Sequence, residues 1–229
     1  MTQDDIMNEY AVIVAAGSGR RMGSEIPKQF LEIAGKPVLM HTIERFRAYS
    51  ESIKIIVVLP ENQISNWNEL QKKYPFSIPH LVVKGGEKRY HSVRNGLEAI
   101  VSPGLVAIHD GVRPLVSTGT IRRCFEAAAS HGSAIPVISP ADSLRIVTDQ
   151  GSVPVNRQHV RLVQTPQVFD TELIRRAYLL DYTFEFTDDA TVLEKAGEQV
   201  FLVEGNRENI KITSPEDIVT AEALFPYVT

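Results

Sequence analysis

Short apolar runs alternate with longer amphipathic stretches through most of the chain. The apolar runs, rich in β-branched residues, occur at 10–15, 53–59, 80–84, 105–110 and 133–139. The stretches between them carry apolar residues at helical spacing, at 37–50, 62–74, 91–100 and 118–132. Strands that are apolar along their whole length are typical of a parallel sheet covered by helices on both faces. The pattern predicts an α/β fold with a doubly wound, mostly parallel sheet, whose ligands collect at the carboxyl ends of the strands.

This alternation stops at residues 140–168. Segments 143–147 and 160–164 are strand-like, the stretch between them is rich in turn-forming residues, and no helical pattern intervenes. The pattern predicts a protruding β-hairpin arm. An arm with apolar strands and little core of its own usually packs on another surface, often that of a second subunit.

The C-terminal part of the chain returns to compact elements. Helices are expected at 170–182 and 188–197, and strands at 199–205 and 209–213. A last helix begins at Ser214, a good N-cap residue followed by Pro215 and two acidic residues. Because the sequence has no repeat or linker, we expect one domain over residues 1–229, including a dimerisation arm at about 140–168.

Composition narrows the classes of function. The formal net charge of -4 argues against a general nucleic-acid or membrane-surface binder, so any bound anion must meet a local basic site. The single cysteine, Cys124, lies in a helical pattern and is expected to be a small buried residue rather than a nucleophile. No signal-peptide pattern or bilayer-length apolar run is present, so we expect a cytoplasmic location.

A glycine-rich turn directly follows the first predicted strand, in AAGSGRRMGSEIPKQF at 15–30. Gly17 and Gly19 allow backbone N–H groups to approach phosphate oxygens, and Arg20, Arg21 and Lys28 supply cations. The alternative interpretation is a solvated basic turn. A P-loop is excluded because position 22 is methionine and no Lys-Ser or Lys-Thr pair follows. The dinucleotide-binding fingerprint G-x-G-x-x-G is also disfavoured, because it requires a third glycine at position 22 and this sequence has that glycine at 23.

The same stretch resembles the signature of the sugar-nucleotide pyrophosphorylase-like nucleotidyltransferases. Within that superfamily the chain is similar to the 2-C-methyl-D-erythritol 4-phosphate cytidylyltransferases of the non-mevalonate isoprenoid pathway. The motifs that carry the resemblance are PKQF at 27–30, GGEKRYHSV at 85–93, HDGVRP at 109–114, VNR at 155–157, QTPQVF at 164–169, TDDA at 187–190 and ENIKIT at 208–213. The resemblance implies transfer of CMP from CTP to a polyol phosphate with release of pyrophosphate.

The resemblance also implies roles for individual residues. Arg21 and Lys28 match transition-state stabilisers, and Arg157 and Lys211 match residues that position the acceptor for attack. The CTP site would comprise Ala15, Ala16, Gly17, Ser18, Gly19, Arg21, Lys28, Gly85, Gly86, Glu87, Ser92 and Asp110. The acceptor site would comprise Arg113, Ser143, Arg157, Thr165, Thr187 and Lys211.

Asp110 ends a predicted strand, and Arg113 follows three residues later. A carboxylate among phosphates and cations suits a Mg²⁺ ligand, whereas the alternative is a loop salt bridge between Asp110 and Arg113. The family pattern favours the metal, so Mg²⁺ or another divalent cation is the expected cofactor. His109 is expected to be structural.

Two other functions stay open from the sequence. A ribitol 5-phosphate cytidylyltransferase would keep the chemistry and change the acceptor. A non-catalytic nucleotide-binding regulator would keep the scaffold and lose the reaction. The resemblance favours the methylerythritol enzyme, working as a homodimer whose arm shares the active sites, with no nucleic-acid or membrane partner.

Overall fold

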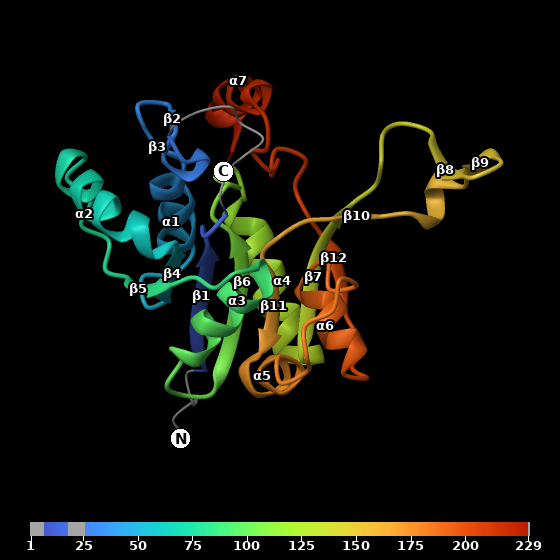
Figure 1. The fold of residues 1–229 in the computed structure, drawn as a ribbon, viewed down its shortest axis with the longest axis horizontal. Helices are drawn as coiled ribbons and strands as arrows, with labels where there is room; N and C mark the ends of the chain where they lie inside the picture. The colour runs from blue at the N-terminus through green and yellow to red at the C-terminus, as the bar shows by residue number, and fades with distance from the viewer. Residues whose placement is uncertain (1–6, 18–25, 229) are drawn as a thin grey trace.

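A mixed sheet forms the central layer of the molecule (Figure 1). The structure is a computed structural model that describes residues 7–17 and 26–228. Within these residues the sheet has eight strands in the order β10-β7-β11-β6-β1-β4-β5, and β12 also pairs with β7. Their bounds are β1 Asn8–Val14, β4 Lys54–Leu59, β5 Leu81–Lys84, β6 Gly104–Asp110, β7 Ser133–Ile138, β10 Leu162–Val163, β11 Gln167–Asp170 and β12 Leu202–Glu204.

The strand directions confirm the doubly wound, mostly parallel prediction. β1 pairs in parallel with β4 on one side and with β6 on the other, and β4 pairs in parallel with β5. The chain therefore winds outward from β1 in both directions, and Val14 and Asp110 are register partners at the point where the winding reverses. β11 was not predicted from the sequence, and it lies antiparallel between β6 and β7.

Helices cover both faces of the sheet. On one face lie α1 (Val38–Tyr49), α2 (Ile64–Lys73) and α4 (Thr118–His131), and on the other lie α3 (Arg89–Glu98), α5 (Thr171–Ala177) and α6 (Asp189–Lys195). Along β1, Ala11 and Ile13 enter the first core while Tyr10 and Val12 enter the second. The strands are apolar throughout because both of their faces are buried.

A third, smaller apolar cluster lies beside the sandwich. It joins the short hairpin of β2 (Glu32–Ile33) and β3 (Lys36–Pro37) to the C-terminal helix α7 (Pro215–Leu224). Ser214 caps α7 in a reciprocal capping box with Asp217, which confirms the predicted helix start. None of the helices in the described part of the chain combines the length and apolarity of a bilayer span.

The arm projects away from the sheet (Figure 1), but its hairpin differs from the prediction. β8 (Leu144–Thr148) pairs with β9 (Gly151–Val155), because a tight turn reverses the chain after Thr148. Segment 160–164, expected to be the second arm strand, instead contributes β10, which pairs with β7. β9 contains glycine, serine and proline, which are typical of turns, and the segment was therefore predicted to be a turn. An exposed hairpin strand can accommodate these residues.

Two further expectations are wrong. Residues 209–213 are not a strand, because this segment is held by irregular contacts such as Ile212 N–H donating to Val112 O at 3.0 Å. α5 ends at Ala177, so the helix is shorter than the expected 170–182. Burial of Cys124 in the core under α4 confirms its structural interpretation.

Candidate active site

A cavity of about 400 Å³ lies where the carboxyl ends of β1 and β6 meet. This is the position at which ligands of doubly wound sheets collect. The loops after β1 and β5, the start of α3, the end of β6 and the segment before α7 all contribute to its wall. The lining residues are Val14, Ala15, Ala16, Gly17, Lys28, Gln29, Gly86, Glu87, Lys88, Arg89, Ser92, Asp110, Val112 and Lys211.

One wall of this cavity consists of closely packed main chain. A Cβ added at Gly85 would lie 2.6 Å from Ala16 Cβ, and one at Gly86 would lie 2.4 Å from His91 Cβ. The buried Ser92 hydroxyl accepts the Gly86 N–H at 3.1 Å and thereby fixes the turn. Only glycine fits at these two positions, because a Cβ would collide with Ala16 or His91, and this part of the wall therefore presents main chain.

Three cations surround Asp110. Lys211 Nζ lies 2.9 Å from Asp110 Oδ2, Arg113 Nε lies 3.5 Å from the same oxygen, and Arg89 Nε lies 3.3 Å from Oδ1. Burial by itself would raise the pKa of the Asp110 carboxyl, but Arg89, Lys211 and Arg113 outweigh burial and hold that pKa well below its usual range. Asp110 is therefore ionised at neutral pH. The loop ion pair with Arg113, which the sequence analysis offered as the alternative to a metal site, is present.

His109 and Thr165 form a buried brace behind Asp110. The Asp110 N–H donates to Thr165 Oγ1 at 3.2 Å, and Thr165 Oγ1 lies 3.0 Å from His109 Nδ1. His109 Nε2 lies 3.1 Å from Arg113 O, and because a carbonyl only accepts, this nitrogen carries the proton. Burial lowers the pKa of the His109 imidazole to about 4, so the ring is neutral. His109 is structural, as expected.

Sequence reasoning missed the partner of Arg89. The Arg89 guanidinium forms a fork on Asp189, with distances of 2.8 and 2.7 Å, and the Tyr178 hydroxyl donates to Asp189 at 2.6 Å. Arg89 lies in the GGEKR motif and Asp189 in TDDA, so both were within quoted motifs. Nothing in their spacing, 100 residues apart, indicates that they meet.

The phosphate loop is described only in part. Lys28 lies in the cavity wall with its ammonium 3.4 Å from Ile212 O, and Gln29 Nε2 donates to Ala15 O at 3.0 Å. Ser18, Gly19, Arg20 and Arg21 lie outside the described residues. The described part of the loop therefore brings one predicted cation to the cavity.

Of the six predicted acceptor residues only Lys211 lines this cavity, and Arg113 borders it through its ion pair with Asp110. The Thr165 hydroxyl is engaged behind Asp110, and Thr187 is exposed beside Thr191. Ser143 and Arg157 are exposed on the arm, where Arg157 donates to Ala141 O. Within one chain the structure therefore brings together the described nucleotide residues, Arg113 and Lys211, but not the arm residues.

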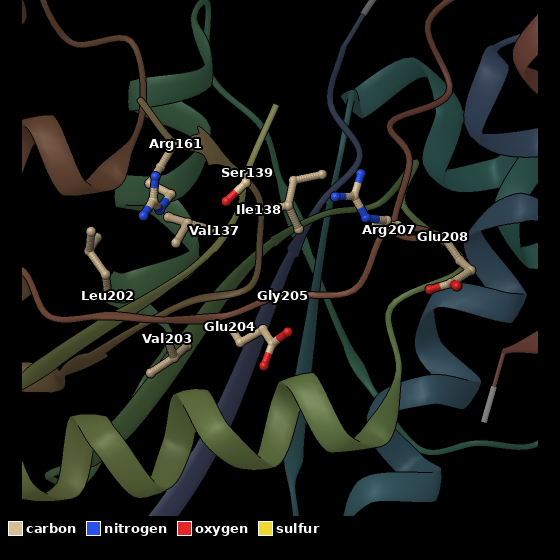
Figure 2. Close-up of a pocket in the computed structure, with 10 residues that line it drawn as sticks. All are labelled: Val137, Ile138, Ser139, Arg161, Leu202, Val203, Glu204, Gly205, Arg207 and Glu208. Atoms are coloured by element: carbon tan, nitrogen blue, oxygen red, sulfur yellow. The ribbon is translucent and has the colours of Figure 1, made fainter. Parts of the chain in front are cut away.

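Arg157 lines a separate cavity of about 430 Å³ at the base of the arm. A wider groove of about 690 Å³ adjoins it along β7 and β12 (Figure 2). Arg161 and Arg207 line both spaces. The remaining lining residues of the groove are Val137, Ile138, Ser139, Leu202, Val203, Glu204, Gly205 and Glu208. Although this groove is larger than the strand-end cavity, it lacks the glycine-rich wall and the buried carboxylate, so we assign the chemistry to the strand-end cavity.

The residues of the strand-end cavity fit a magnesium ion that takes most of its ligands from substrate phosphates and water. The described residues contain no group of three His, Cys, Asp or Glu side chains able to enclose a metal. Asp110 offers an ionised oxygen donor at the cavity wall. Mg²⁺ commonly binds through one or two carboxylates together with substrate phosphates and waters, and one carboxylate therefore suffices.

Comparison with known proteins agrees with this arrangement. The family model for IspD, 2-C-methyl-D-erythritol 4-phosphate cytidylyltransferase, matches residues 10–226. Proteins of that name from Bacteroides thetaiotaomicron and Bacteroides fragilis are 53% and 54% identical over 219 residues, covering 96% of this chain and 100% of each relative.

Solved structures give the same result. The crystal structure of 4-diphosphocytidyl-2C-methyl-D-erythritol synthase from Anaerococcus prevotii has a TM-score of 0.83 at 32% identity, covering 96% of both chains. The 2-C-methyl-D-erythritol 4-phosphate cytidylyltransferase from Thermus thermophilus has a TM-score of 0.78 at 35% identity, covering 95% of this chain and 98% of that one. The chain therefore belongs to the 2-C-methyl-D-erythritol 4-phosphate cytidylyltransferase family of nucleotidyltransferase enzymes.

Proposed function

We propose that the protein transfers CMP from CTP to 2-C-methyl-D-erythritol 4-phosphate, giving 4-diphosphocytidyl-2-C-methyl-D-erythritol and pyrophosphate. The observation that carries this proposal is the ionised Asp110, ringed by Arg89, Arg113 and Lys211, opposite a wall of close-packed glycines. The cation-rich side suits phosphates and the flat side suits a pyrimidine. The family and the names of its relatives favour the methylerythritol acceptor over ribitol 5-phosphate.

In the proposed reaction, an oxygen of the acceptor phosphate attacks the α-phosphorus of CTP. A new P–O bond forms as the bond to the β-phosphate oxygen breaks, and pyrophosphate leaves with that electron pair. Charge on the transferring phosphoryl group must be offset by positioned cations. We assign this task to Arg21 and Lys28, and assign positioning of the acceptor phosphate to Lys211 and Arg157.

The nucleotide residues have separate tasks in this proposal. Ala15, Ala16, Gly86 and Ser92 receive the cytosine edge, and Glu87 lies near the ribose. Asp110 would hold Mg²⁺ together with phosphate oxygens, and the bound ion would neutralise phosphate charge. Ser143, Thr165 and Thr187 are assigned to the acceptor as hydrogen-bonding groups, together with Arg113. Gly17, Ser18, Gly19 and Gly85 are assigned to CTP.

We also propose that the whole chain is one nucleotidyltransferase domain that works as a homodimer in the cytoplasm. The arm exposes Ile146, Val147 and Val153, with 82% of Val147 accessible. Exposed apolar side chains on a protruding hairpin support a partner surface. Arg157 lies at the base of this arm and away from the cavity of its own chain, which supports a role in the partner's site.

The test is pyrophosphate release by the purified protein with CTP and Mg²⁺. Methylerythritol phosphate and ribitol 5-phosphate are supplied in separate reactions at equal concentrations. We expect release with the first acceptor and at least tenfold lower kcat/KM with the second, since buried polar groups matched to one polyol are left unpaired by another. Release with ribitol 5-phosphate alone would reassign the acceptor, and CTP binding without turnover would favour a regulator.

A further inference from the structure

Arg89 connects two buried carboxylates. It is the first residue of α3 and lies immediately after the glycine turn of the cavity wall. Its two terminal nitrogens contact Asp189 at 2.8 and 2.7 Å, and its Nε contacts Asp110 Oδ1 at 3.3 Å. The Asp189 side chain has no exposed surface, and the Tyr178 hydroxyl donates to its Oδ1.

We propose that Arg89 is a positioning residue that orients Asp110 toward Mg²⁺·CTP, and that Asp189 is the counter-charge that keeps Arg89 from neutralising Asp110. This inference rests on the proposed function and extends it to two residues that have no assigned role. Arg89 acts through Asp110, so it need not touch the reacting atoms.

Geometry supports this division of labour. A guanidinium matches one carboxylate with its planar fork and still presents Nε–H in a fixed direction, which a lysine ammonium cannot do. The shorter, paired contacts go to Asp189, and the longer single contact goes to Asp110. Arg89 therefore makes its two stronger hydrogen bonds to Asp189, which lies outside the cavity lining. Asp110 receives only one weaker hydrogen bond, which orients its carboxylate.

The balance of charge supports the role of Asp189. Without it, Arg89, Arg113 and Lys211 would all face the single carboxylate of Asp110. A divalent cation would then have to compete with three side-chain cations for one anion. Asp189 supplies a second carboxylate to the same cluster, which reduces the excess positive charge beside Asp110.

The position of Asp189, the first residue of α6, is fixed by its neighbour Asp188. Asp188 accepts Gln167 Nε2 at 2.8 Å and caps α6 through the Thr191 N–H at 2.9 Å. The start of α6 is therefore fixed to β11, and Arg89 joins this fixed point to the nucleotide wall. Asp110 is thus held from the α6 side by an anchor that is independent of the loop ion pair with Arg113.

The experiment compares CTP affinity in Mg²⁺ with CTP affinity in EDTA by isothermal titration. For Arg89→Lys we expect the gain in affinity that Mg²⁺ supplies to fall about tenfold, since one charge-assisted hydrogen bond is lost. Affinity in EDTA should fall much less, because lysine keeps the positive charge in the cavity wall. A purely structural role would lower both affinities together. An unchanged metal-dependent gain would overturn the proposal.

Arg175→Lys is the matched control. Arg175 Nε and NH2 donate to Leu97 O, at 3.1 and 2.8 Å, near the opposite end of the same helix. Arg175 belongs to α5, so the control removes an arginine that holds the far end of α3 and has no contact with Asp110. We expect an unchanged metal-dependent gain. A loss as large as that of Arg89→Lys would overturn the positioning role, because it would trace the effect to the placement of α3.

Asp189→Asn tests the counter-charge. We expect this variant to reduce the gain in CTP affinity that Mg²⁺ supplies. In an Arg89→Lys background it should cause no additional reduction, because Asp189 acts through Arg89. Additive losses would overturn that part of the proposal. If Asp189→Asn fails to fold, Arg89→Lys decides the inference alone. Because these titrations omit the acceptor, a failure of the proposed reaction would show separately, as absent pyrophosphate release by the wild-type protein.

Discussion

The strand-end cavity and the arm differ in how completely one chain satisfies their side chains. In the cavity, Asp110 is largely buried and contacts three cations. On the arm, Val147 and its apolar neighbours are exposed, and the nearby Arg157 contacts only a backbone carbonyl among the hydrogen bonds described for it. One region has most of its partners within the chain, and the other presents groups without such partners.

This difference supports our proposal that the reaction is divided between two chains. The CTP side needs fixed geometry, which strands buried on both faces provide. The acceptor side, in our proposal, is completed only when a second arm arrives. The following experiments test the contrast, beginning with the largest expected effect.

Metal removal should abolish activity, because the negative charge of the triphosphate would lose its divalent partner. Excess EDTA should reduce pyrophosphate release to background, and added Mg²⁺ should restore it. Asp110→Asn should stay impaired at every Mg²⁺ concentration, because an amide lacks the charge that a hard cation prefers. Full activity of Asp110→Asn at the wild-type Mg²⁺ level would contradict direct ligation.

Lys28→Ala should lower kcat on the order of a hundredfold or more while changing the KM for CTP much less, because the proposed contact strengthens as charge develops. Steady-state kinetics at saturating acceptor would measure both constants. Lys72→Ala, on the exposed side of α2, is a suitable control. A raised KM with unchanged kcat would mean that Lys28 binds CTP without acting on the transition state.

Mixing Lys28→Ala with Arg157→Ala should restore activity if Arg157 enters the partner's site. Random exchange makes about half of the dimers mixed, each with one intact site, so roughly a quarter of wild-type activity should return. Exchange is followed independently with differently tagged chains. A mixture that stays inactive after proven exchange would place Arg157 in the site of its own chain.

Val147→Asp should weaken the dimer about tenfold or more, since a buried valine contributes roughly 1.5–3 kcal/mol and an unpaired carboxylate resists burial. Sedimentation velocity over a concentration series would measure the dissociation constant. Val101→Asp is the matched control, because Val101 is 87% exposed but lies outside the arm. Equal dissociation constants for the two variants would show that the arm is not part of the dimer interface.

The buried strands and their helices could be predicted from the sequence because their apolar pattern is dictated by burial on both faces. The antiparallel β11 could not, since a four-residue buried strand has no signal that distinguishes direction. The arm hairpin was misread because β9 contains a glycine and a proline, which are rare in paired strands.

In the candidate site, too, some features were visible in the local sequence and others were not. The position of Asp110 at a strand end was visible in the sequence, and the place of that strand beside β1 brings it to the glycine turn. Lys211 was identified only through family resemblance, and the structure puts it 2.9 Å from Asp110. The Arg89–Asp189 pair depends on where the start of α3 lies relative to the start of α6, and local sequence patterns do not encode such long-range packing.

The base of the arm has a consequence for engineering. Ile138 and Leu162 lie directly opposite each other as antiparallel partners, so the chain leaves the sheet and re-enters it at a closed junction. A two-residue hairpin can join such partners, and the excursion between them can therefore be excised without moving either end. If the arm holds the proposed dimer together, a shortened chain of this kind separates folding from assembly, and its unfolding free energy no longer depends on protein concentration.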